Sequence, residues 1–145
     1  MRQFTPKNTG PFAVNDVKHI SIYIDCRPLD IYEFASNPEN LPRWAAGLAT
    51  SDVMWDGTTW IAEAPFGRVR LRFSPSNGLG VMDHDVELES GVVVHNPMRV
   101  VPNGDGGELI FTLIRQANMT DLEFQNDCVA VQADLHALKV ILENI

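Results

Sequence analysis

Alternating apolar and polar residues mark most of the chain as β-structure. The stretch VKHISIYID, which begins at Val17, places Ile20, Ile22 and Ile24 on one face, as in a half-buried strand. Six more strands are predicted in the stretches SDVMWD, TTWIAEA, GRVRLRFS, VMDHDVELE, VVVHNPMRVV and ELIFTLIR. Short turns rich in Asp, Gly, Asn, Pro and Ser join them. We therefore expect a first strand followed by a six-stranded antiparallel meander.

Helical patterns follow the first strand and close the chain. RPLDIYEFAS and NPENLPRWAAGLA predict two short helices, because Pro28 suits a first helical position and Asn37 can cap the second helix. TDLE at 120–123 matches a capping box, and apolar residues then recur in steps of four and three. They are Phe124, Cys128, Val131, Leu135, Leu138, Leu142 and Ile145. This pattern predicts one long amphipathic helix that covers the apolar face of the sheet.

The dipeptide Asn77-Gly78 predicts a two-residue hairpin turn, and that register decides which side chains face the core. It sets Leu71 against His84, both pointing inward, and a turn at Pro65-Phe66 adds Trp60 to the same face. Three opposite-charge pairs are expected on the outer face: Arg72 with Asp83, Arg70 with Asp85, and Arg68 with Glu87. Because the pleat separates His84 from both aspartates, no metal site is predicted here.

A second histidine lies in the stretch VVVHNP. If the preceding hairpin turns at Ser90-Gly91, His95 opposes Val86 and also faces inward. Pro97 cannot donate to a ladder, so it is expected to mark a bulge. The facing of Met98 and Arg99 is left open.

Composition narrows the class of protein. A chain of 145 residues suits one domain, which we place at 17–145 after an N-terminal arm or loop at 1–16. The net charge of -8 argues against nucleic-acid partners. No apolar run is long enough for membrane insertion, and the N-terminus lacks the apolar core of a signal peptide, so a cytoplasmic protein is expected. Cys26 and Cys128 are expected to be reduced thiols, and no cofactor is predicted.

The order of elements, strand, two short helices, six strands and a long helix, resembles the helix-grip fold of the SRPBCC or START-like superfamily. The resemblance covers roughly 17–145 and rests on ISIYIDCRPLDIYEFASNPENLPRW, FGRVRLRF, GVMDHDV, PMRVVPNGDGGELIFTLIRQ and VQADLHALKVILE. These stretches are similar to polyketide cyclase/dehydrase-like proteins and to a bacterial subgroup without an established activity. The resemblance implies an α+β fold in which a seven-stranded curved antiparallel sheet wraps around the C-terminal helix.

A curved sheet gripping one helix leaves a hollow unless large side chains fill it, so a ligand cavity is expected. The candidate ligand-binding residues are Trp44, Trp60, Leu71, Phe73, Met82, His84, Val86, His95, Phe111, Leu135 and Leu138. The leading hypothesis is noncatalytic binding of an apolar or aromatic small molecule.

Two alternatives stay open. His84 and His95 are candidate catalytic residues for a polyketide cyclase or dehydratase, because a histidine can move a proton while Asn96 or Arg99 polarises a carbonyl. The other is a protein-interaction module like the Hsp90-ATPase-activator homologues. A homodimer is expected if Val92, Val94, Phe111 and Leu113 form an outer apolar patch, whereas a monomer suffices if they turn inward.

Overall fold

Residues 14–145 are described by this computed structural model, which begins with strand β1 (Val17–Ile24). Residues 14–16 precede it without regular structure, and the rest of the predicted N-terminal arm lies outside the described residues. Three short helical segments follow: α1 (Pro28–Ala35), the 3-10 turn η1 (Pro38–Asn40) and α2 (Leu41–Trp44). As expected, Asn37 caps η1, with its side-chain oxygen accepting from the Glu39 N–H at 3.1 Å. The predicted second helix is thus short and irregular.

Seven further strands precede the long helix. They are β2 (Met54–Trp55), β3 (Trp60–Ala64), β4 (Gly67–Phe73), β5 (His84–Glu87), β6 (Val93–Asn96), β7 (Met98–Asn103) and β8 (Gly106–Ile114). The described residues therefore hold eight strands rather than the expected seven. The extra strand arises at Pro97, which has no N–H to donate and divides the predicted stretch VVVHNPMRVV into β6 and β7.

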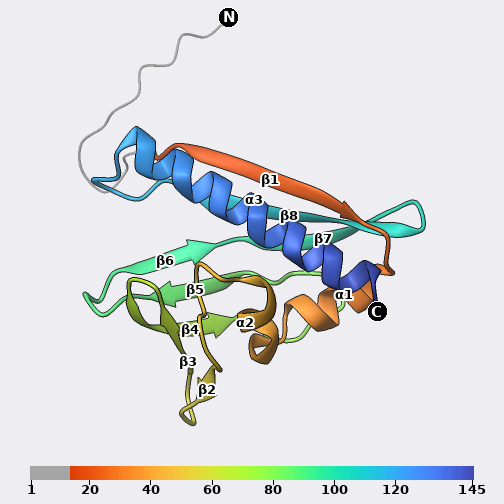
Figure 1. The fold of residues 1–145 in the computed structure, drawn as a ribbon, viewed down its shortest axis with the longest axis horizontal. Helices are drawn as coiled ribbons and strands as arrows, with labels where there is room; N and C mark the ends of the chain where they lie inside the picture. The colour runs from red at the N-terminus through yellow and green to blue at the C-terminus, as the bar shows by residue number, and fades with distance from the viewer. Residues whose placement is uncertain (1–13) are drawn as a thin grey trace, which may run out of the picture.

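The eight strands form two antiparallel sheets, ordered β1-β8-β7 and β2-β3-β4-β5-β6. Residues 80–82 connect them, because the Met82 N–H donates to the Met98 carbonyl at 2.8 Å and Val81 bridges to Arg99. Figure 1 shows helix α3 (Asp121–Glu143) lying along β1, β8 and β7, with the larger sheet and α2 to one side. The arrangement is α+β and has the helix-grip architecture that the sequence predicts.

Helix α3 begins at the predicted capping box. Thr120 accepts the Glu123 N–H at 3.1 Å, and the Glu123 carboxylate accepts the Thr120 N–H at 3.0 Å. Its buried side chains are Leu135, Leu138 and Leu142, all in the C-terminal half. In the N-terminal half, the apolar residues that pack against the core, Phe124, Cys128 and Val131, are only half-buried, so this half is held less tightly against the sheet. No helix within residues 14–145 combines the length and apolarity needed to cross a membrane.

The register between β4 and β5 differs from the predicted one by two residues. Leu71 pairs with Val86 instead of His84, and Phe73 pairs with His84. Asn77 does not adopt the positive φ that a type I′ turn needs; its side-chain oxygen instead accepts the Leu79 and Val81 N–H groups and closes a longer loop. A shift of two keeps every side chain on its expected face, so His84 still points inward.

The same shift changes the expected ion pairs on the outer face. Arg72 bonds Glu87 at 3.2 Å rather than Asp83. The other two arginines reach across to neighbouring residues, Arg70 to Asp56 at 2.6 Å and Arg68 to Glu63 at 2.8 Å. The predicted turn at Pro65-Phe66 is confirmed, because β3 pairs with β4 across it and Trp60 lies opposite Leu71.

The residues after Pro97 keep the alternation of the strand. Met98 is fully buried, whereas Arg99 is exposed and lies 3.4 Å from Asp83 Oδ2. Further along, Phe111 and Leu113 of β8 are buried, Val94 is half-buried and Val92 is exposed. Because only Val92 is exposed, these four residues do not form the outer apolar patch on which the homodimer expectation depended.

Candidate functional site

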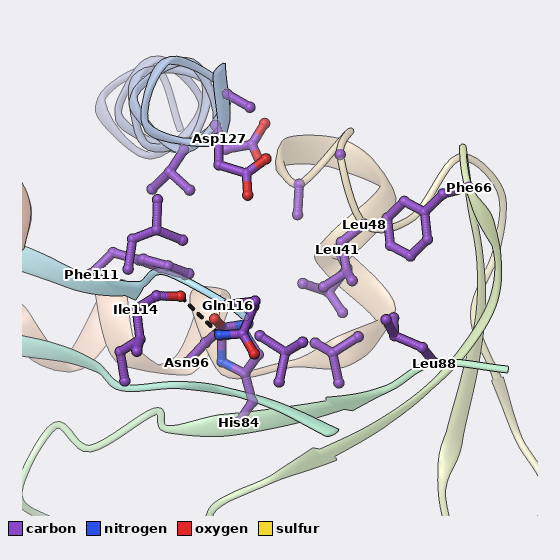
Figure 2. A pocket seen from close by; sticks show the side chains of 18 of the residues that line it. Leu41, Leu48, Phe66, His84, Leu88, Asn96, Phe111, Ile114, Gln116 and Asp127 are labelled. Atoms are coloured by element: carbon purple, nitrogen blue, oxygen red, sulfur yellow. Dashed lines mark hydrogen bonds between the residues drawn. The ribbon is translucent and has the colours of Figure 1, made fainter. Parts of the chain in front are cut away.

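A cavity of about 510 Å³ lies between the N-terminal half of α3, the α2 segment and the inner faces of both sheets. It exists because α3 places no fully buried side chain on the sheet before Leu135. Most of its walls are apolar: Leu41, Trp44, Ala45, Leu48, Phe66, Val86, Leu88, Val92, Val94, Phe111, Leu113, Ile114, Ala117, Met119, Ala130, Val131 and Leu135. Its polar wall residues are His84, Asn96, Gln116, Asp127 and Asp134. Figure 2 shows His84 on the sheet side and Asp127 on the helix side, facing each other across the hollow.

His84 forms part of the sheet-side wall and is 4% exposed. Its ring stacks on Phe73 with centroids 4.7 Å apart and meets Phe111 edge-on at 6.1 Å. Nδ1 lies 3.1 Å from the Met82 carbonyl oxygen. Burial is the main cause that lowers the pKa of His84, so the ring is neutral at physiological pH.

The hydrogen bond to Met82 also fixes the tautomer of the neutral ring. A carbonyl oxygen only accepts, so Nδ1 must carry the proton and donate it. Nε2 then presents a lone pair, and no described residue is hydrogen-bonded to it. His84 therefore offers a ligand one hydrogen-bond acceptor.

Two carboxylates of α3 form the opposite wall. Burial raises the pKa of Asp134 to about 6, and the backbone N–H of Ala46 offsets part of that rise. Burial and then the nearby Glu123 carboxylate raise the pKa of Asp127. Neither aspartate has an ion-pair partner within residues 14–145, and the described residues contribute no Lys or Arg to the cavity wall.

The remaining polar groups of the wall are neutral. Asn96 is buried and pairs with His84 in the β5–β6 register. Gln116 donates its amide to the Ile114 carbonyl at 2.8 Å, which leaves its side-chain oxygen as an acceptor. The indole N–H of Trp44 is buried and has no hydrogen-bond partner among the described residues. The side-chain amides of Asn96 and Gln116 can each donate and accept, whereas the Trp44 N–H is covered by protein atoms.

The expected inward facing of His95 is wrong. Its partner in the sheet is Asp85, not Val86, and its Nδ1 lies 2.6 Å from Asp85 Oδ1 on the outer face. The hairpin uses the loop 89–91 with Gly91 at φ 89°, one residue longer than the expected turn. A one-residue slip reverses every side chain of β6, so Asn96 occupies the inner position instead.

The other candidate residues divide between the cavity and the core. Trp44, His84, Val86, Phe111 and Leu135 line the cavity. The remaining ones pack into the core without reaching it: Trp60, Leu71, Phe73, Met82 and Leu138. Trp60 lies beside the exposed Trp55, with ring centroids 5.4 Å apart and ring planes tilted by 56°, near the β2 edge of the larger sheet.

Asp127 and Asp134 were not among the residues predicted from the sequence. They are seven positions apart and flank the apolar stripe at Val131, so both lie on the face that α3 turns to the sheet. That spacing could have placed both aspartates on the inner face, but an aspartate beside an apolar stripe usually faces solvent. Within residues 14–145, no three His, Cys, Asp or Glu side chains are grouped so as to hold a metal ion.

The chain matches no family model and no curated protein sequence. Its structure is similar to that of the Aha1 dimer from Colwellia psychrerythraea, with a TM-score of 0.70, 17% identity and coverage of 88% of this chain and 96% of that chain. Ara h 8.0201 gives a TM-score of 0.68 at 10% identity, covering 90% and 99%. CalU16 from Micromonospora echinospora gives 0.65 at 12% identity, covering 94% and 80%. At these identities the similarities show the fold alone, which is the helix-grip fold.

Proposed function

We propose that this protein binds an apolar small molecule, aliphatic or aromatic, in the cavity between α3 and the sheets, without catalysing its conversion. The observation that supports the proposal is a hollow of about 510 Å³ with mainly apolar walls. Ligand sites of small molecules are typically concave, mainly apolar and of this size, with a few polar groups that orient the ligand.

Binding without catalysis agrees with the surroundings of His84. A general base is usually oriented by a carboxylate, whereas the Nδ1–H of His84 donates to a backbone carbonyl. The alternative that used His84 and His95 together is withdrawn, because His95 lies on the outer face and cannot contact the same ligand. A protein-interaction function is not proposed, because the similarity to the Aha1 dimer establishes the fold alone.

A neutral apolar fluorophore such as N-phenyl-1-naphthylamine tests this function. Its emission should rise when it enters the cavity. Val131→Trp should weaken binding by about tenfold or more, because the indole occupies the hollow next to α3. Val129→Trp is the matched control, since Val129 is 59% exposed on the same helix and should leave binding unchanged.

Two results would remove the proposal. One is no rise in emission with the unmodified protein at any reachable probe concentration. The other is equal binding by both tryptophan variants, which would place the probe outside the cavity. Far-ultraviolet circular dichroism of each variant checks that the fold is intact.

A further inference from the structure

Several polar groups in the cavity wall are hydrogen-bond acceptors, and two of them are carboxylates. Asp127, Asp134, the Nε2 atom of His84 and the side-chain oxygen of Gln116 all accept hydrogen bonds. The two carboxylates add negative charge, and no described wall residue is cationic. A ligand with an anionic head group would meet repulsion and find no described cation to pair with it.

The state of Asp134 points to a positively charged partner. A half-buried carboxylate without a cation is costly, because burial penalises its charged form. A cation brought next to it would recover part of that cost and gain a charge-assisted hydrogen bond. A cavity whose wall holds a carboxylate with no described cationic partner is therefore matched to a ligand that brings a positive charge.

His84 provides an independent observation on the other wall. It is 4% exposed and lines the cavity, and its Nε2 lone pair has no hydrogen-bond partner among the described residues. Figure 2 shows His84 beneath the hollow, across from Asp127. An N–H or O–H donor on the ligand would satisfy this acceptor. A ligand with hydrogen-bond donors could therefore pair with acceptors at both walls.

We propose that the cavity selects an apolar molecule carrying a basic nitrogen, whose ammonium group binds the Asp134 carboxylate while the apolar body fills the hollow. This inference rests on the proposed function, since it assumes that the cavity holds a ligand. Asp127 lies two helical turns from Asp134, about 10 Å along the axis, so it strengthens the negative potential without sharing the same contact. Long-chain amines and aromatic amines fit this description, and fatty acids do not.

The test compares three ligands that share one apolar body: 1-naphthylmethylamine, 1-naphthylmethanol and 1-naphthoate. Isothermal titration calorimetry at pH 8 keeps Asp134 ionised and the amine protonated. We expect the amine to bind about tenfold or more tightly than the alcohol, and the carboxylate to bind most weakly. Decylamine, decanol and decanoate should follow the same order.

Two matched variants locate the charge that matters. Asp134→Asn should remove the preference for the amine over the alcohol. Asp105→Asn removes the same charge from the exposed turn between β7 and β8, so it should keep the preference. Asp127→Asn should reduce the preference less than Asp134→Asn does.

The outcomes separate this inference from the proposed function. Equal binding of the amine and the alcohol, abolished by Val131→Trp, would overturn the amine inference and leave cavity binding in place. Tighter binding of the carboxylate would do the same. An amine preference that survives Asp134→Asn, or falls equally with Asp105→Asn, would overturn it as an effect of bulk charge. Failure of the three ligands and of the neutral fluorophore would remove both proposals.

Discussion

Asp134 carries a charge in the cavity wall that reduces the stability of the fold. Burial raises its pKa to about 6, whereas an aspartate in an unfolded chain titrates near about 3.9. The folded state thus holds this proton more strongly than the unfolded state does. The stabilising contribution of the protonated form is complete below about pH 4, declines as the pH rises through about 4 to 6, and is absent above that window.

Asp134→Asn should therefore stabilise the protein at neutral pH but not in acid. We expect the free energy of unfolding to rise by about 1 to 2 kcal/mol at pH 7.5, less than the full pKa shift implies because solvent screens this partly exposed carboxylate, and to change little at pH 4. Urea unfolding at both pH values measures the difference. Asp105→Asn, at an exposed position, should show no such pH dependence. A loss of stability at pH 7.5 in Asp134→Asn would contradict the prediction.

The two inward-facing histidines expected from the sequence illustrate what a residue pattern can predict. The inward facing of His84 was predicted correctly although the β4–β5 register was not, because the register differs by two residues and an even shift preserves the face. The facing of His95 was predicted wrongly, because the β5–β6 register differs from the predicted one by one residue, and an odd shift reverses the face. Alternation alone fixes a strand's two faces, but the loop length decides which of them is inside.

At the scale of elements, the sequence motifs whose hydrogen-bond partners are only a few residues apart were predicted correctly. The capping box at Thr120 and Glu123, the Asn37 cap and the turn before β4 all appear where the sequence places them. The turn at Asn77-Gly78 was predicted wrongly because the residues that follow it pair with a different strand. Its neighbour Gly80, at φ 70°, accepts the Val100 N–H at 3.0 Å, so residues 80–82 pair with β7 and not with β4.

The capping box should contribute measurably to the stability of α3. Thr120→Ala removes the hydroxyl that accepts the Glu123 N–H, and we expect the free energy of unfolding to fall by about 1 kcal/mol. Thermal and urea unfolding measure the change. Thr58→Ala is the matched control, because Thr58 lies in an exposed turn and its hydroxyl makes no hydrogen bond to a described residue. An equal loss in both variants would show that the cap is not responsible.

At the scale of the molecule, the sequence could predict that a cavity exists, but not which polar groups lie in its wall. The order of elements predicts a hollow between sheet and helix, and the candidate residues Trp44, His84, Phe111 and Leu135 lie in its wall. The polar selectivity of that hollow depends on how α3 lies across both sheets. Three-dimensional packing, not spacing along the chain, brings Asp134 close to the α2 segment near Gly47.

The uneven packing of α3 should appear in hydrogen exchange. Amides at 125–131 cover the cavity, whereas those at 135–142 lie on fully buried leucines. We expect the first group to exchange faster in the free protein, because local opening there breaks fewer apolar contacts. A saturating amine ligand should slow the first group more than the second. Uniform exchange along the helix, with or without ligand, would contradict this prediction.

A helix anchored along only one half also bears on which guests the protein can accept. Leu135, Leu138 and Leu142 secure the C-terminal half of α3, so the opposite end can tilt outward while the anchored half stays in place. We expect the width of the hollow to adapt to its occupant, whereas the carboxylate at the boundary between the two halves keeps its position. The cavity would then accept ligands of different widths but remain selective for their charge.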